Sequence, residues 1–490
     1  MITRACILTA LLLFPWASAQ SGERVMTEFK DKRAKTPEVL SHVPLKAVVS
    51  EFLDPLDSGL GKSLGYLIWR EVLTAISDQA GAGVIVAEAP PGERLVDLLE
   101  QDYHQAAERI GRHQRARMVI WGAVEEEQDE LLIDIYLSTL TDNGDSGLKL
   151  SLSSKVVAGP RDLGGTANVT GIEANISHKR FNFAPIISSR QALFERTLVT
   201  AAAVKIVAAP NSSAKTLLKL PAGRAIQAVD MIGAWFKIKV PAGGFGFIHA
   251  GSFGNLRLPP KEITGKRNSV NLRAGPGTDH PIVGNRNLKG RFRVLDMRYR
   301  PHQGLWYRID LGSDESWVAG WLVEPRFSFP AVHFIAGLYR YYGERHNQGI
   351  KAFEQFIERT SPIDDNVNLS TAYQLVGASK LLSGAGASKG YRDFSSAIAL
   401  TPYNPNAYLL RGLASLGTSR PKLALDDMEK ALQLDADFKP AHRMVAKAAT
   451  IANQRSYNPL GRVTRLPSRK REIKRLVKRF RIKTITVPRR

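Results

Sequence analysis

The sequence predicts a multi-domain protein that contains a small α/β layer domain, two small β-barrel domains and an all-α solenoid of helical pairs. Strand and helix patterns alternate between residues 45 and 157, which favours an α/β layer sheet. Between residues 196 and 325, Gly and Pro interrupt short β-type runs at close intervals, as in small barrels or sandwiches. From residue 371, two consecutive blocks of 34 residues can be aligned, and a repeat of that length indicates a helical solenoid.

The N-terminal segment has the pattern of a secretory signal peptide. Arg4 precedes an apolar run from Ala5 to Phe14, and the small residues Ala17-Ser18-Ala19 follow. This run is shorter than the roughly twenty apolar residues that a membrane span requires. We therefore expect residues 1–19 to be a signal peptide, with the mature chain starting near Gln20 in a periplasmic or exported location, and with an uncleaved anchor as the alternative.

Cysteine usage and charge limit the possible functions. The single cysteine, Cys6, lies within the signal segment, so the mature chain has neither a disulfide nor a thiol nucleophile, and each domain depends on its own hydrophobic core. The formal net charge is +22 over 490 residues. Residues 455–490, the basic tail, contain fourteen Lys or Arg and one Glu, so the basicity is mainly local.

Residues 44–158 are predicted to form the α/β domain, with helical spacing of apolar residues from Leu60 onward and again near Leu95. The predicted strands are LKAVVSEF, GVIVAEA, MVIWGAV and LLIDIYLSTL, with LKLSLSSKVV as an edge strand. This order resembles the N-terminal domain of the TolB family, and the resemblance implies a protein-interaction or assembly module. We interpret residues 159–195, which lack periodicity, as a linker or loose extension.

Two β-units follow. The second β-unit, residues 264–325, contains the turn Asn271 to Gly277, a Leu288-Lys289-Gly290 turn, the aromatic pair Trp306-Tyr307 and the closing Trp317-Val318. These elements resemble a bacterial SH3-type domain, although Ser316 stands where that family usually has Gly. The first β-unit, residues 196–257, repeats the plan more weakly and lacks the full Arg and Gly pattern of the leading turn, which puts its ligand binding in doubt more than its fold.

Residues 330–453, the helical repeats, resemble the tetratricopeptide repeat. Small or apolar residues recur at equivalent positions of the two blocks, as in Ala378 with Gly412 and Phe394 with Met428. An earlier degenerate pair places Gly337 and Phe353 in matching roles, and residues 439–453 are predicted to form a capping helix. The small residues let antiparallel helices approach each other closely.

Aromatic residues of the second β-unit are the candidate ligand-binding set. The predicted site consists of Arg273, Trp306, Tyr307, Trp317 and Trp321. Because side chains alternate between the two faces of a strand, we expect either Trp306 or Tyr307 at the surface, not both. The resemblance implies a cell-wall stem peptide or a proline-containing protein segment as the ligand.

Two further surfaces are candidates for binding partners. Leu409, Leu413 and Leu416 have a spacing that suits the concave face of the repeats, and packing against the neighbouring SH3-type domain is the alternative. A basic amphipathic helix in the tail suits an anionic membrane surface, whereas a disordered, solubilising tail is the alternative. The cations of this predicted helix are Lys470, Arg471, Lys474, Arg475, Lys478, Arg479 and Arg481.

The sequence shows no catalytic, metal or cofactor site. Gly59-Leu60-Gly61-Lys62-Ser63 follows a strand and opens a helix, but Leu56 stands where a phosphate-binding loop requires Gly. The histidines are scattered, and a solvated hairpin turn explains the acidic stretch 125–130 better than a calcium loop does. We therefore expect an exported envelope scaffold or adaptor, not an enzyme, that binds envelope proteins and peptidoglycan or peptide, with nucleic acid disfavoured by export. The alternative is a cell-wall hydrolase or accessory enzyme that SH3-type modules direct to its substrate.

Overall fold

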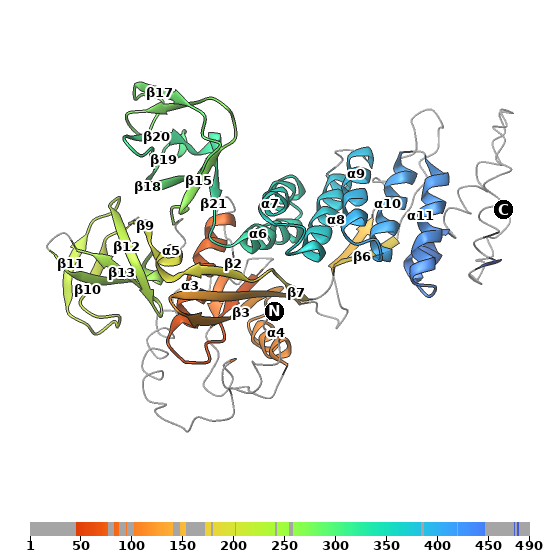
Figure 1. Cartoon of the computed structure of the whole chain (residues 1–490), viewed down its shortest axis with the longest axis horizontal. Helices are drawn as coiled ribbons and strands as arrows, with labels where there is room; N and C mark the ends of the chain where they lie inside the picture. The colour runs from red at the N-terminus through yellow and green to blue at the C-terminus, as the bar shows by residue number, and fades with distance from the viewer. Residues whose placement is uncertain are drawn as a thin grey trace. The chain divides into compact units, whose positions relative to one another are not determined.

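The computed structural model of the chain describes most of residues 46–445 and three positions of the basic tail (Figure 1). The described residues are 46–76, 83–87, 95, 102–140, 148–152, 172–177, 180–200, 202–240, 243–253, 258–383, 387–418, 420–445, 475, 478 and 479. The signal segment lies outside them. Within this part of the chain, no helix is both long enough and apolar enough to cross a membrane.

The α/β domain is built on a mixed sheet, as the sequence predicts. Its elements are β1 (Lys46–Ser50), α3 (Leu60–Ile76), β2 (Gly83–Ala87), α4 (Tyr103–His113), β3 (Met118–Glu127), β4 (Glu130–Thr139), β7 (Arg180–Asn182) and β8 (Ile186–Ser189). The strand order is β2-β1-β3-β4-β7, and β8 also pairs with β4. Strands β3 and β4 form the predicted acidic hairpin, whose turn residues Gln128 and Asp129 both have positive φ, as a tight hairpin turn requires.

The edge of this sheet differs from the expectation. Strand β5 (Leu148–Leu152), predicted as the edge, instead pairs with β6 (Ile172–Ser177) in a separate two-stranded sheet. The edge is formed by β7 and β8, and α5 (Arg190–Phe194) follows them. The interpretation of residues 159–195 as a linker is therefore wrong for 180–195. The physical reason is that Phe181 and Phe183 are buried against Phe334, so long-range packing orders a segment that has no local periodicity.

The strands of the first β-unit follow the same order as those of the second, which adds one further strand at its edge. The first contains β9 (Arg196–Val199), β10 (Val204–Val207), β11 (Thr216–Leu220), β12 (Ala225–Ile232), β13 (Trp235–Lys239), β14 (Phe245–His249) and η4 (Ala250–Phe253). The second contains β15 (Glu262–Gly265), β16 (Val270–Arg273), β17 (Ile282–Arg286), β18 (Phe292–Arg300), β19 (Gly304–Asp310), β20 (Glu315–Ala319), η5 (Gly320–Leu322) and β21 (Val323–Arg326). Their orders are β11-β10-β14-β13-β12-β9 and β17-β16-β20-β19-β18-β15-β21.

Register irregularities fall at corresponding positions in the two units. One falls between Ile206 and Val207 in the first unit and another between Leu272 and Arg273, 66 positions later, in the second. The irregularity that begins at Ala228 recurs at Val294, again 66 positions later. Because a bulge re-aims a strand at a fixed point, the strands of the two units bend at corresponding places.

Neither sheet closes into a barrel, contrary to the expected fold class. In hydrogen-bond order both sheets are open paths that end at β11 and β17. Apolar side chains on these end strands stay exposed, with Leu217 at 46% and Val283 at 57%. Each end strand therefore pairs only with its hairpin partner. Its exposed apolar side chains gain no burial that would favour pairing with the opposite edge of the sheet.

The helical repeats run from α6 to α11, and successive helices pack against each other (Figure 1). They are α6 (Pro330–Tyr342), α7 (His346–Arg359), α8 (Asn366–Leu382), α9 (Ala387–Leu400), α10 (Pro405–Gly417) and α11 (Pro421–Leu434). The predicted close approach of Gly337 to Phe353 is present, because a Cβ at Gly337 would lie 2.6 Å from that ring. Residues 439–445 of the predicted capping helix are helical, and the rest of it lies outside the described residues.

Candidate functional site

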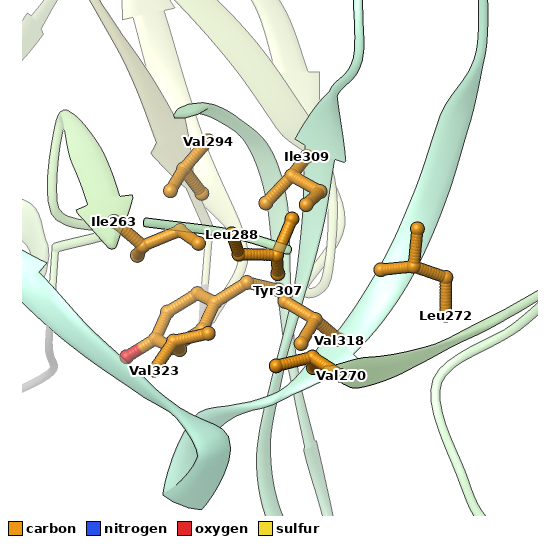
Figure 2. Close-up of a cluster of buried hydrophobic side chains, with 9 residues drawn as sticks. All are labelled: Ile263, Val270, Leu272, Leu288, Val294, Tyr307, Ile309, Val318 and Val323. Carbon is orange, nitrogen blue, oxygen red and sulfur yellow. The ribbon is translucent and has the colours of Figure 1, made fainter. Parts of the chain in front are cut away.

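The two central aromatic residues of the second β-unit are both buried. Trp306 is 1% exposed and Tyr307 is 6% exposed, so the expectation that one of them lies at the surface is wrong. Figure 2 shows the Tyr307 ring among apolar side chains that include Ile263 and Val323. Trp306 points to the other face of β19, where Trp321 covers it with ring centroids 5.4 Å apart. Both faces of this strand are therefore covered.

Trp321 provides the exposed aromatic surface of the unit. Its side chain is 50% exposed, and its ring meets Trp306 edge to face at 83°. An edge-to-face pair of this kind is favourable beyond the area that it buries. Lys266 donates from Nζ to the Trp321 carbonyl at 3.3 Å. The buried Trp306 ring thus packs against the exposed Trp321 ring and orients it.

Arg273 and Trp317 belong to a different part of the unit. Arg273 donates from Nη1 to the carbonyl oxygens of Thr278 (3.0 Å) and His280 (2.5 Å), so it holds the leading turn in place. In the antiparallel pairing of β16 with β20, Arg273 stands opposite Trp317, which is half-buried. A ligand role for either residue stays a prediction.

A cleft of about 1140 Å³ lies beside Trp321, and we call it the basic cleft. Its lining comes from α3 (Thr74 and Ala75), the first β-unit (Val199, Thr200 and Gly223), the second β-unit (including Lys266, Arg298, Tyr299, Tyr307 and Trp321) and the first helical pair (including His333, Arg340, Gln348 and Lys351). Of the five residues predicted for ligand binding, Tyr307 and Trp321 line the cleft, and Arg273, Trp306 and Trp317 do not. A concave site that several modules build together is the usual setting for ligand binding.

The lining of the basic cleft is positively charged. Lys266, Arg298, Arg340 and Lys351 contribute cations, and no Asp or Glu is found among the described residues that line it. Two of these cations are held in place: Arg298 donates to the Gly223 carbonyl and pairs with Asp296 at 2.9 Å, and Arg340 donates to the Ala75 carbonyl at 2.6 Å. A concave surface with one sign of charge concentrates ligands of the opposite sign.

His333 is a neutral member of this lining. Burial holds the pKa of the imidazole well below its usual range, and the neighbouring charge of Arg359 lowers it further. Nε2 of the ring lies 2.7 Å from Nη1 of Arg359, an arrangement in which the unprotonated nitrogen accepts the hydrogen bond. His333 therefore adds no charge to the cleft at neutral pH.

Sequence reasoning missed most of the cleft. Tyr299 is 71% exposed, and Lys351 and Arg340 lie in helices that the sequence does not connect with the second β-unit. Because these residues come from separate elements and form no motif, only the tertiary packing reveals them. The single local signal was the aromatic content around Trp306 and Trp321.

Comparison with known proteins identifies one module directly. Residues 268–324 match the family model of the bacterial SH3 domain. The prediction for the second β-unit is thereby confirmed, and domains of this type are typically non-catalytic binding modules. For the first β-unit and for the TolB resemblance, the expectations stay predictions. No curated protein matches the chain.

Solved structures similar to the chain include tetratricopeptide domains. The tetratricopeptide domain of Arabidopsis OM64 is 23% identical, with a TM-score of 0.22, and the match covers 25% of this chain and 94% of that domain. The first such domain of human RPAP3 is 17% identical, with a TM-score of 0.23, over 26% of this chain and 97% of that one. MamA from Desulfovibrio magneticus is 16% identical, with a TM-score of 0.24, and the match covers 32% of this chain and 78% of that one.

The leucines expected on an open concave face are largely inside the protein. Leu409 is 0% exposed and Leu413 is 1% exposed, and Leu416 is half-buried. Helix α10 packs against α9 and α11, and β6 lies against it as well. The expectation of an accessible surface at Leu409 and Leu413 is therefore wrong, because these side chains form the core between helices.

Three of the predicted tail cations are described. Arg475, Lys478 and Arg479 are exposed, and Arg475 and Arg479 both form ion pairs with Glu429 of α11, the latter at 2.6 Å. Lys470, Arg471, Lys474 and Arg481 lie outside the described residues. Their role at an anionic surface stays a prediction.

The Gly59 to Ser63 segment is explained by helix capping. The Asp54 carboxylate accepts hydrogen bonds from the Leu60 and Gly61 amides at 3.0 and 3.2 Å, which are amides that a bound phosphate would need. Gly61 is required because a Cβ there would lie 2.2 Å from the Phe52 carbonyl oxygen. A phosphate-binding role therefore has no support.

The described residues contain no cluster of His, Cys, Asp or Glu that could hold a metal ion. The acidic residues 125–130 lie at the exposed end of the β3–β4 hairpin. This position agrees with their interpretation as a solvated turn.

Proposed function

We propose that the protein is an exported, non-catalytic adaptor of a bacterial cell envelope, which holds a protein or peptide ligand in the basic cleft. The single observation that carries this proposal is the exposure of Trp321 and Tyr299 at a concave, positively charged site that the α/β domain, both β-units and the helical repeats build together. The SH3 match supports a binding role for one wall of that site.

Export is supported by the signal-peptide pattern of residues 1–19. The proposed location is the periplasm or the exterior, and the basic tail would keep the protein peripheral to an anionic membrane. The expected partners are envelope proteins and peptidoglycan or peptide. The TolB resemblance of the α/β domain supports a second assembly surface, and several weak sites on one chain raise each other's effective concentration.

In-cell photo-crosslinking tests the adaptor function. A photoreactive amino acid at Lys351, in the cleft, should yield adducts with a discrete envelope protein, and one at Ile363, which is 95% exposed and does not line the cleft, should not. The mature chain recovered from the envelope should begin near Gln20. Adducts at both positions alike, or a chain that keeps residues 1–19 inside the cell, would contradict the proposal.

A cell-wall hydrolase guided by its SH3 domain is the competing function. A zymogram with the purified full-length chain on cell-wall material separates the two. The adaptor proposal predicts no clearing, whereas clearing that persists when residues 190–490 are deleted would establish the hydrolase.

A further inference from the structure

We propose that the basic cleft recognises an extended acidic segment of a partner protein, with carboxylates of the segment paired to the cleft cations and its apolar side chains on Trp321 and Tyr299. This inference rests on the proposed adaptor function and names the ligand class of the same site. It follows from the charge of the lining, the exposure of two aromatic rings and the size of the cleft.

The cations face the ligand from two walls. Lys266 and Arg298 belong to the second β-unit, whereas Arg340 and Lys351 belong to α6 and α7. The described lining includes no carboxylate, and of the four cations Arg298 pairs with Asp296, which lies outside the lining. A ligand that satisfies both walls must carry more than one negative group, and charge complementarity of this kind sets partner choice and association rate.

The aromatic rings supply the apolar part of the contact. Trp321 is 50% exposed and Tyr299 is 71% exposed, and Trp306 holds the Trp321 ring from below. Exposed rings with few rotatable bonds give contact area at a low entropy cost. A purely ionic ligand would leave these rings unused, so a segment that interleaves acidic and apolar residues fits best.

Size and backbone access favour a polypeptide. The volume of about 1140 Å³ exceeds the roughly 300–1,000 Å³ of pockets for small molecules. Gly304 lines the cleft and has open space where a Cβ would stand, so a ligand backbone can approach the protein backbone closely at this position. A flat lipid surface would reach only the rim of such a concavity.

Two charge reversals in the full-length chain test the inference. Lys266 and Lys351 are exposed, so Lys266→Glu combined with Lys351→Glu should leave the fold intact. The matched control is Lys289→Glu, an exposed lysine of the same β-unit outside the cleft. The probe is a fluorescent peptide in which Glu alternates with Leu-Ser. A second peptide, in which Gln replaces every Glu, is the neutral counterpart.

The expected result is binding of the Glu peptide, weaker binding with rising salt, and a loss of about tenfold or more in affinity in the double variant but not in the control. Trp321→Phe should reduce affinity for both peptides to a lesser degree. The inference would be overturned by equal affinity for the Glu and Gln peptides, or by equal effects of the double variant and Lys289→Glu. It would also be overturned if the cleft preferred anionic vesicles or purified cell wall to the peptide. If the peptide fails while the Lys351 crosslink to a partner persists, the adaptor function stands without an acidic ligand.

Discussion

The Glu71 carboxylate of α3 lies 3.1 Å from Nη2 of Arg196 in β9, and both side chains are almost fully buried, at 4% and 1% exposure. Ser328, just before α6, donates its backbone N–H to both carboxylate oxygens and its Oγ–H to one of them at 2.7 Å. The α/β domain, the first β-unit and the helical repeats thus meet at one ion pair. The modules that the sequence separates share a common interior.

We expect removal of one partner of this pair to be strongly destabilising. Glu71→Ala leaves the Arg196 guanidinium buried without its counter-ion, which typically costs about 3–5 kcal/mol. Urea unfolding measures the loss. The control is Glu315→Ala, which breaks the exposed Arg308–Glu315 pair and should cost less than about 1 kcal/mol. Similar losses for the two variants would contradict a buried, structural role for Glu71.

Acid should destabilise the protein through His333. The folded-state pKa of this histidine is well below its usual value, because burial lowers it most and the charges of Arg359, Arg326 and Arg340 lower it further, while a hydrogen bond with the Gln355 side chain acts in the opposite direction. The unfolded chain therefore takes up a proton near pH 6.5 that the folded chain refuses, so this contribution to stability is lost as the pH falls below about 6.5.

The measurement compares urea unfolding at about pH 7.5 and about pH 5. His333→Gln, which keeps a hydrogen-bond acceptor for Arg359, should lose less stability on acidification than the wild type. His302→Gln, at an exposed position, should show the wild-type loss. A variant with an unchanged pH dependence would assign the acid sensitivity to other groups.

Local patterns predicted the elements well and their assembly poorly. The β3–β4 hairpin, the SH3 match and the glycine–phenylalanine contacts of the repeats all depend on residues close in sequence or at a fixed period. The ordered structure of residues 180–195 depends instead on Phe181 and Phe183, which pack against Phe334 of α6, about 150 positions away. No local pattern in the sequence encodes that contact.

The candidate site illustrates the same limit. Trp321 could be proposed from its aromatic neighbourhood, but the burial of Trp306 depends on Trp321 folding back over it. The cations of the cleft come from the second β-unit and from α6 and α7. Surface lysines and arginines are common, so only their convergence distinguishes these four.

Close helix packing predicts the effect of a methyl group in α8. A Cβ at Gly377 would lie 2.7 Å from the Phe394 ring, so Gly377→Ala should cost about 1–3 kcal/mol through overpacking, although alanine favours a helix by about 1 kcal/mol. Thermal unfolding measures the change. Gly343→Ala, whose Cβ would make only an ordinary 3.4 Å contact, is the control. Phe394→Leu in the Gly377→Ala background should recover part of the loss, and the absence of any loss would contradict the tight packing.

The Asp54 cap predicts both a stability change and an absence of nucleotide binding. Asp54→Ala removes the acceptor for the Leu60 and Gly61 amides and should cost about 1–2 kcal/mol, whereas Asp54→Asn retains an acceptor and should cost less. Adding ATP should leave the unfolding temperature of the wild type unchanged. An ATP-dependent rise would show that phosphate displaces the carboxylate and would restore the phosphate-binding interpretation.

The ion pairs of Glu429 predict how the tail responds to a membrane. Arg475 and Arg479 pair with Glu429 while remaining 58% and 52% exposed, so docking on α11 uses two cations that an anionic surface would also bind. Glu429→Gln should release them and raise affinity for vesicles that contain phosphatidylglycerol, since each cation near such a surface contributes about 1 kcal/mol. The control is Glu358→Gln, which changes an exposed carboxylate of α7, and vesicle flotation measures binding.

Truncation after Asn453 should abolish vesicle binding, and rising salt should weaken vesicle binding because exposed charges are screened. Equal flotation of the full and truncated chains would assign membrane affinity to another part of the protein.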